Sequence, residues 1–108
     1  MFDFYKDNDP LSGYVNFVDK ETAINKGLFN ITSNGSIYIG VDSENKASER
    51  GRDSIRLHSN KNYSHGLFVL DLAHIPSNVC GTWVAFWLVG WGRSFPESGE
   101  IHVIEGEH

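Results

Sequence analysis

Two glutamates near the end of the chain have the residue type and spacing for paired acid–base and nucleophilic chemistry. Glu100 and Glu105 lie in the run Gly-Glu-Ile-His-Val-Ile-Glu-Gly, residues 99–106. Retaining cleavage of a glycosidic bond uses such a pair, one carboxylate as nucleophile and one carboxylic acid as proton donor, ~5–5.5 Å apart. The two groups must lie in different environments, so that one is ionised while the other is protonated. The pair is therefore a candidate catalytic site, with two solvated carboxylates on an edge strand as the alternative.

The alternation of side chains along a β-strand would separate these two carboxylates. Residues 100, 102 and 104 of a regular strand point to one face and residues 101, 103 and 105 to the other. A one-residue β-bulge between Glu100 and Glu105 restores a common face, and bulges are frequent beside active sites. With it the two Cα atoms are roughly 13 Å apart, which two long side chains can close. The spacing therefore predicts a β-bulge.

Short apolar or alternating runs divided by turn residues predict strands along most of the chain. The predicted strands are residues 14–18, 28–32, 36–41, 54–58, 67–72, 82–89 and 100–104. Asn34-Gly35 predicts a hairpin turn, because this dipeptide tolerates positive φ. Asp19 can cap a short helix over residues 20–26, which Gly27 ends. Residues 42–53 are polar without an apolar period and predict an exposed loop, so the class is an antiparallel sandwich or barrel.

Composition limits the size and the partners of this protein. The chain has 108 residues, of which 40% are hydrophobic and 21% charged, as in a single soluble domain with a modest core. The net charge of -5 argues against binding to a nucleic-acid backbone, which draws on Lys and Arg clusters. No apolar run approaches the ~18 residues of a membrane span. A neutral polymer or a small molecule remains open as the partner.

Three Asn-X-Ser/Thr triplets, beginning at Asn30, Asn34 and Asn62, favour a secretory route. The first residues lack the basic start and apolar run of a signal peptide. Cys80 is the single cysteine, and an odd cysteine in a secreted protein indicates a partner outside the chain. We expect a secreted, extracellular protein whose signal peptide is not present in this chain.

The strand around the two glutamates resembles the catalytic strand of glycoside hydrolase family 16, whose pattern is Glu-x-Asp-x-x-Glu. Residues 80–87, Cys-Gly-Thr-Trp-Val-Ala-Phe-Trp, resemble the family's Cys-Gly-Thr-Trp-Pro-Ala-Phe-Trp block. Residues 13–19, 54–57 and 67–76 also match in order, so the resemblance spans essentially the whole chain. It is to the laminarinase, or endo-β-1,3(4)-glucanase, type. It implies an all-β antiparallel sandwich, a concanavalin A-like jelly roll, with residues 1–108 as one partial domain truncated at its C-terminus.

The resemblance also implies roles for particular residues, with a β-glucan as substrate and no cofactor or metal. Glu100 takes the position of the nucleophile and Glu105 that of the acid/base. The positions that bind the sugar are taken by Asn16, Arg56, Trp83, Trp87 and Phe95. Arg56 has a structural ion pair as an equal alternative. The two tryptophans lie four apart, on the same face of the predicted strand. Trp87 is favoured for the cleft, and a core position for one of the two is the alternative.

His102 stands where the family has its central Asp. An imidazole flanked by two carboxylates tends to become protonated, because opposite charges favour its charged form. A cationic neighbour would favour ionised Glu105, which is the wrong state for a general acid. We therefore expect impaired catalysis with glucan binding retained. The alternative is a catalytically inactive glucan-binding relative of the same fold.

Two further expectations concern the end of the chain. The resemblance implies that a C-terminal half of the domain is missing here and acts as a partner, because half a sandwich leaves open edges and an uncovered apolar face. We therefore expect the chain alone to fold poorly. A metal site of His102, Glu105 and His108 is a second alternative, although spacings of three suit a helix better than a strand.

Overall fold

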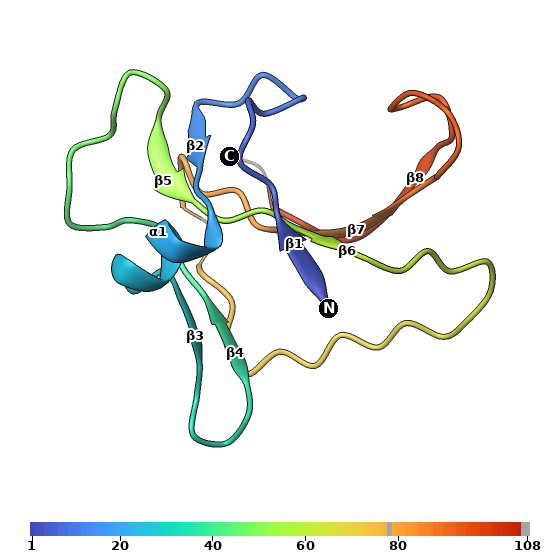
Figure 1. Ribbon diagram of the computed structural model, residues 1–108, viewed down its shortest axis with the longest axis horizontal. Helices are drawn as coiled ribbons and strands as arrows, with labels where there is room; N and C mark the ends of the chain where they lie inside the picture. Colours follow the sequence, from blue (N-terminus) through green and yellow to red (C-terminus); the bar gives the residue numbers. More distant parts are fainter. Residues whose placement is uncertain (78, 107–108) are drawn as a thin grey trace. The chain divides into compact units, whose positions relative to one another are not determined.

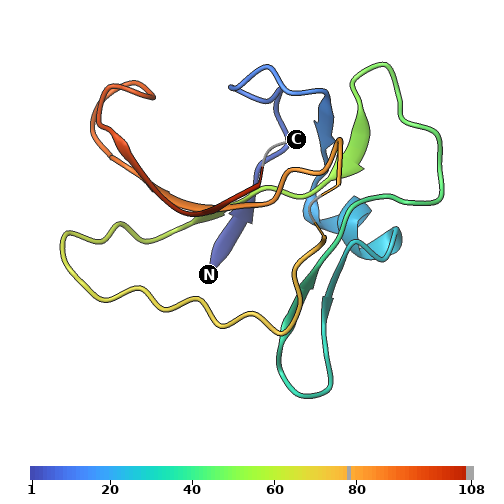
Figure 2. The same cartoon turned by 180° about the vertical axis from the view of Figure 1, so that it is seen from behind.

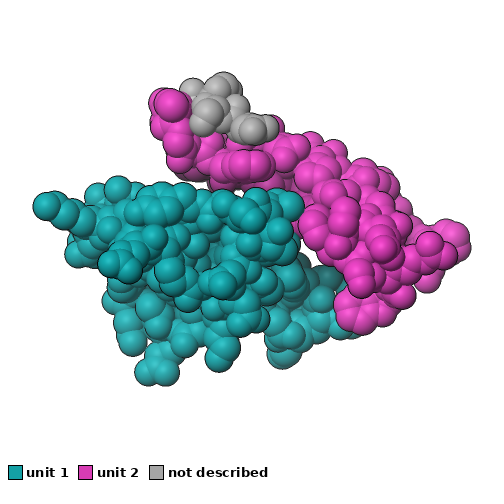
Figure 3. Space-filling model, turned by 90° about the horizontal axis from the view of Figure 1, so that it is seen from above, with its two compact units in different colours: residues 1–61 teal, residues 62–108 magenta. Residues whose placement is uncertain are grey.

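The computed structural model describes residues 1–77 and 79–106, which form short strands and one helix (Figure 1). The chain divides into two compact units, Met1–Lys61 and Asn62–His108, coloured separately in Figure 3. The elements in chain order are β1 Phe2–Phe4, β2 Val15–Phe17, α1 Lys20–Asn25, β3 Phe29–Ile31, β4 Ile37–Ile39, β5 Arg52–Ser54, β6 Leu57–Ser59, β7 Ala85–Val89 and β8 Glu100–Glu105. The described residues contain no helix of the length and apolarity that crossing a membrane requires.

The first unit contains three two-stranded pairings. β1 pairs with β6 and β3 pairs with β4, both antiparallel, and β2 pairs with β5 in parallel. The β3–β4 hairpin, visible from both sides in Figures 1 and 2, turns through Asn34 and Gly35. Gly35 has a φ of 85°, the left-handed conformation that the Asn-Gly prediction required. The predicted hairpin is therefore confirmed.

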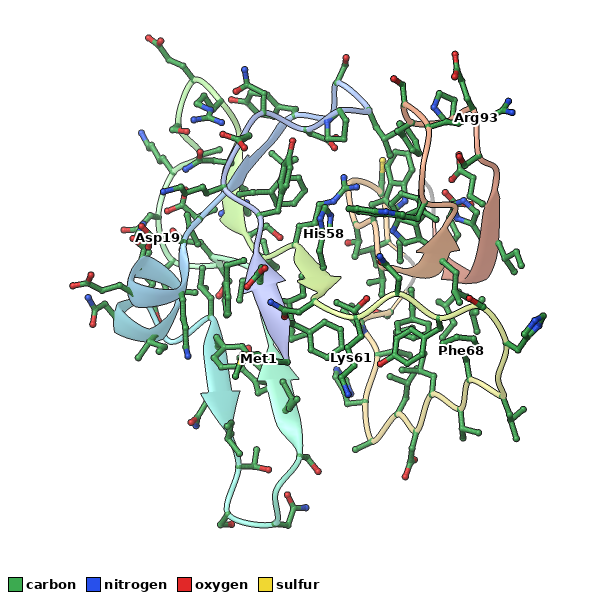
Figure 4. All side chains as sticks on the ribbon, turned by 45° about the vertical axis from the view of Figure 1, so that its right-hand side comes forward. Met1, Asp19, His58, Lys61, Phe68 and Arg93 are labelled. Carbon is green, nitrogen blue, oxygen red and sulfur yellow. The ribbon has the colours of Figure 1, made fainter. Side chains whose placement is uncertain are left out.

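Helix α1 follows the capping pattern of its sequence. The Asp19 side chain accepts a hydrogen bond from the Thr22 backbone N–H, at the helix end labelled in Figure 4. Gly27, with a φ of 67°, ends the helical turn. One helical face buries Ala23 against Val18 and Leu28, and these three side chains are the buried apolar core of the described residues. The helix therefore anchors the first unit through a small apolar contact.

The second unit is organised by the antiparallel β7–β8 hairpin. Its strands are joined by residues 90–99, which close at the base with a Gly90 N–H to Gly99 carbonyl hydrogen bond of 2.8 Å. A side chain at Gly90 would collide with Ser98, since a Cβ there would lie 2.2 Å from the Ser98 carbonyl oxygen. Glycine at this position therefore permits the close approach that closes the connecting segment.

The all-β prediction is confirmed, with little helix and mostly strands, but several boundaries were wrong. Residues 67–72 form no strand, and residues 82–84 precede β7 rather than belonging to it. The predicted strand 54–58 is divided between β5 and β6, and β1 was not predicted. The β2–β5 pairing is parallel, whereas the prediction was antiparallel. Short runs of three residues carry too little periodicity to fix such pairings.

The prediction of an exposed loop over residues 42–53 was also wrong in part. Asp42 is buried, with 7% of its surface exposed, and Arg52 and Asp53 belong to β5. The Arg52 guanidinium donates hydrogen bonds to the carbonyl oxygens of Asp42 and Asn45, at 2.9 Å each. Polar partners inside the segment, rather than apolar contacts, therefore hold it against β5.

Candidate active site

Strand β8 carries the predicted β-bulge. Trp87 of β7 is the partner of His102 and Phe86 is the partner of Ile104, so Val103 has no partner on β7. The extra residue changes the alternation of side chains after His102. Glu105, opposite Ala85, therefore points to the same face as His102, and the prediction of a bulge between the two glutamates is confirmed.

Glu100, His102 and Glu105 form one connected cluster on this face. The His102 Nε2 lies 2.6 Å from Glu100 Oε2, and its Nδ1 lies 3.3 Å from Glu105 Oε2. The three side chains are each about one-third exposed, so solvent and a ligand both reach them. A hollow of about 210 Å³ borders Glu105, lined also by Thr82 and Val84. The two carboxyl groups thus lie on opposite sides of one imidazole ring.

Aromatic rings support the cluster from β7 and from the connecting segment. The Trp87 indole stacks on the His102 ring, with centroids 5.4 Å apart and planes 12° from parallel. Phe95 meets Trp87 edge to face at 5.9 Å. The structure therefore brings two of the three predicted aromatic platforms together with the catalytic candidates. Trp83, 55% exposed, precedes β7, so the premise that it shares a strand face with Trp87 was wrong.

Trp91 is an exposed aromatic residue that was not among the predicted site residues. It lies in the segment between β7 and β8 and is 82% exposed. It lines a shallow hollow together with Arg93, a residue that Figure 4 labels. The signal in the sequence was a tryptophan between Gly90 and Gly92, outside any predicted strand. A tryptophan in such a position has no core to fill, and this could have marked it as a surface residue.

Asn16, on β2, belongs to a polar cluster in the first unit. Its side-chain amide donates to Asp53 Oδ1 at 2.6 Å, and the Lys26 ammonium also donates to Asp53. The Lys26 hydrogen bond, followed by that of Asn16, lowers the pKa of Asp53, and the same contact with Asp53 raises the pKa of Lys26. Asp42 lies 3.9 Å from the Lys26 ammonium. Asn16 is therefore oriented by a network of charged groups.

Arg56 lies in a second cluster of the first unit. Its guanidinium lies 3.3 Å from Asp9 Oδ1 and over the ring of Tyr5, 5.2 Å from the centroid. Its Nε donates to His58 Nε2 at 2.9 Å. Burial, with the Arg56 charge second, lowers the pKa of His58. The ion-pair role that the sequence left open for Arg56 is thus observed with Asp9, and its sugar-binding role stays a prediction.

Within residues 1–77 and 79–106, no group of three His, Cys, Asp or Glu side chains is arranged to hold a metal ion. The suggested metal site with His102 and Glu105 also needs His108, which lies outside the described residues. Cys80 is an exposed free thiol. The chemistry that the described cluster offers is therefore that of two carboxyl groups and an imidazole.

Comparison with known proteins finds a matching family model and similar relatives. The XgeA-like catalytic domain model of glycoside hydrolase family 16 matches residues 2–108. A probable endo-1,3(4)-beta-glucanase of Aspergillus niger is 48% identical over 107 residues, covering 97% of this chain and 14% of that protein. This chain therefore spans about one-seventh of the length of that relative.

Two solved structures are similar over nearly the whole chain. A family 16 beta-1,3-glucosyltransferase, described as elongating, has a TM-score of 0.88 and 45% identity, covering 97% of this chain and 35% of its own. The second is laminarinase 16A of Phanerochaete chrysosporium, solved with beta-glucans in its donor and acceptor sites. It has a TM-score of 0.87 and 35% identity, and the match covers 98% of this chain and 35% of the laminarinase chain. Since the family model covers nearly every residue and these relatives share a third to almost half of them, the chain belongs to glycoside hydrolase family 16.

Proposed function

We propose that this chain contributes the catalytic strand of an enzyme that hydrolyses internal β-1,3 or mixed β-1,3/1,4 bonds of β-glucans with retention. One observation carries the proposal. The bulge at Val103 puts Glu100 and Glu105 on one face of β8, on opposite sides of the ring of His102. The relatives named endo-1,3(4)-beta-glucanase, and the laminarinase solved with bound β-glucans, support the substrate class.

The reaction assigns one task to each carboxyl group. Glu100 attacks the anomeric carbon while Glu105 protonates the departing glycosidic oxygen, which gives a glycosyl ester on Glu100. Glu105 then removes a proton from water, which attacks the same carbon and releases Glu100. Because each step inverts the anomeric centre, the product keeps the β configuration.

The sugar chain would be held by aromatic faces and by polar groups. Trp87 and Phe95, which contact one another beside the cluster, offer apolar rings to pyranose faces, and Trp83 adds a further exposed indole. Asn16 and Arg56 are the proposed hydrogen-bond donors to sugar hydroxyls. All five remain proposed substrate-binding residues.

The test is cleavage of laminarin and lichenan by the full chain, with the anomeric proton of the first product followed by NMR. We expect β-configured products. Glu100→Gln and Glu105→Gln should each lower kcat by a factor of about 10³ or more, since each removes one catalytic group. Glu49→Gln, an exposed glutamate outside the cluster, is the matched control. First products of α configuration, or full activity in both variants, would refute the proposal.

His102 favours a second candidate function, that of a glucan-binding protein without turnover. In the family the position holds Asp, and a histidine there alters the charge between the two carboxyl groups. We expect slow hydrolysis that His102→Asp accelerates. Calorimetry with laminarin oligosaccharides, together with product analysis, separates the two functions. Binding without any cleavage products, both in the unchanged chain and in His102→Asp, would establish glucan binding without turnover.

We also propose that the protein is secreted. The three sequon asparagines, Asn30, Asn34 and Asn62, all lie on exposed segments where a glycan can attach. Expression through a eukaryotic secretory pathway should give a product whose mass falls on enzymatic removal of N-glycans. An unchanged mass would remove the support that these triplets give.

A further inference from the structure

One imidazole ring contacts both carboxyl groups of the candidate pair. His102 Nε2 lies 2.6 Å from Glu100 Oε2, and His102 Nδ1 lies 3.3 Å from Glu105 Oε2. The Trp87 indole lies nearly parallel to the ring at 5.4 Å, which keeps the imidazole plane in the orientation that serves both contacts. Both nitrogens are therefore occupied by carboxyl oxygens at the same time.

The number of protons in the cluster decides whether both contacts are favourable. A neutral imidazole has one N–H, and an ionised carboxylate only accepts hydrogen bonds. With a neutral ring and two carboxylates, one nitrogen lone pair faces an oxygen lone pair. One added proton makes both contacts hydrogen bonds, whether it lies on Nδ1 of His102 or on Oε2 of Glu105. In either form Nε2–H donates to Glu100.

We infer that His102 is a positioning residue that holds the catalytic proton of Glu105 and exchanges it with that carboxyl group across the Nδ1–Oε2 contact. The inference rests on the proposed function, in which Glu105 is the general acid. It also revises the expectation that a charged ring disables Glu105. Two states of the cluster contain the same number of protons. In one the ring is charged and Glu105 is ionised, and in the other the ring is neutral and Glu105 is protonated. They differ only in the position of one proton.

The proton balance follows the two steps of retaining hydrolysis. In the first step the proton moves from Nδ1 to Glu105 and then to the glycosidic oxygen, as the C1–O bond breaks and Glu100 bonds to C1. Glu105 is then ionised and the ring neutral. In the second step Glu105 takes a proton from water, the water oxygen bonds to C1, and the Glu100 ester bond breaks. The proton returns to Nδ1, and the cluster regains its starting state.

No other charged group of the hairpin contacts the ring. Residues 85–89 of β7, which pack against His102, are Ala, Phe, Trp, Leu and Val and contain no titratable side chain. The connecting segment carries Arg93 and Glu97, and neither forms an ion pair with His102 in the described part of the chain. Within the hairpin, the position of the shared proton is therefore governed by His102, Glu100 and Glu105 as one coupled unit.

The pH profile of kcat/KM on laminarin tests this inference. We compare the full chain with His102→Gln, which keeps a neutral hydrogen-bonding side chain and cannot store a proton. Because an isolated imidazole titrates about two pH units above an isolated carboxyl, we expect the alkaline limb to move down by about one unit or more in His102→Gln. His102→Asp should be faster at its optimum and should lose the same alkaline range. An unchanged alkaline limb in both variants would overturn the inference while leaving the proposed function intact.

A second measurement does not depend on turnover or on the folding of His102 variants. The ¹⁵N shifts of the imidazole rings, followed over pH in the full chain, report the charge and tautomer of each ring. We expect Glu105→Gln to change the Nδ1 shift of His102 at a fixed pH, since an amide cannot exchange a proton with the ring. His65 and His74 are internal controls whose shifts should stay the same. An unchanged Nδ1 shift for His102 would overturn the inference even if the chain cleaves no glucan.

Discussion

A single side chain, His102, determines how the two catalytic candidates are connected. The sequence predicted an imidazole between two carboxylates, because only its neighbours along the strand were visible. It could not predict that the two ring nitrogens serve different glutamates, since this depends on the bulge and on the Trp87 ring across the hairpin. The family pattern therefore located the residue, and the geometry determined its contacts.

Asp42 is another residue whose surroundings the sequence did not reveal. Its segment is polar and looked like a solvated loop, yet the carboxylate is buried and accepts hydrogen bonds from the Asn45 side chain and from the backbone N–H groups of Glu44 and Asn45. These bonds, with the Asn45 amide first, lower the pKa of Asp42 from 3.8 to about 2. Polar burial of this kind leaves no hydrophobic pattern in a sequence.

The ionisation of Asp42 should contribute to the pH dependence of the chain's stability. Because its pKa is lower in the folded chain, protonation favours the unfolded chain, so the stabilisation is complete above about pH 4 and is lost as the pH falls towards about 2. Asp42→Asn should flatten the fall of the melting temperature over that range, and Asn45→Ala should flatten it in part. Thermal unfolding at pH 2–5 measures both, with Asn8→Ala as control. An equally steep fall in Asp42→Asn would contradict this assignment.

At the scale of the element, strand β8 departs from regularity by one residue. The sequence predicted this departure because two glutamates five positions apart cannot share a face of a regular strand. Other elements were harder, since β1, β2 and β5 are three residues long and gain their pairing from distant partners. The bulge of β8 was predictable because the chemistry proposed for its two glutamates requires them to share a face.

Two single-residue changes of β8 should differ in their effect on laminarin cleavage. Deleting Val103 removes the extra residue, and regular alternation then still places Glu105 on the face of Glu100. Inserting one alanine after Val103, with the bulge kept, moves Glu105 to the opposite face. We expect the deletion to keep measurable laminarin cleavage and the insertion to abolish it. Circular dichroism of both variants controls for loss of the hairpin, and equal activities would contradict the importance of a shared face.

Over the whole molecule, apolar burial is sparse. The buried apolar residues of the described chain are Val18, Ala23 and Leu28, while many large apolar side chains of the strands remain exposed. Composition predicted a modest core, and hydrophobic periodicity predicted apolar faces, but neither shows which faces are covered. The expectation that the chain alone folds poorly stays a prediction, and these exposed side chains give it a physical basis.

A matched pair of alanine substitutions tests where stability resides. Leu28 is 5% exposed and packs in the core of the first unit, so Leu28→Ala should lower the free energy of unfolding by about 2–5 kcal/mol. Ile31, three positions later on β3, is 63% exposed, and Ile31→Ala should cost less than about 1 kcal/mol. Urea denaturation of the full chain measures both. Equal losses would show that the small core is not the main source of stability.

The stacking of Trp87 on His102 gives the molecule an optical consequence. A charged imidazole against an indole face is a cation–π pair, and it withdraws electron density from the excited indole more strongly than a neutral ring does. Trp87 should therefore be dimmer when His102 is charged, whereas among the described residues no imidazole stacks on Trp83 or Trp91. Replacing those two by phenylalanine would leave Trp87 as the one tryptophan, whose emission would report the charge of His102 in real time.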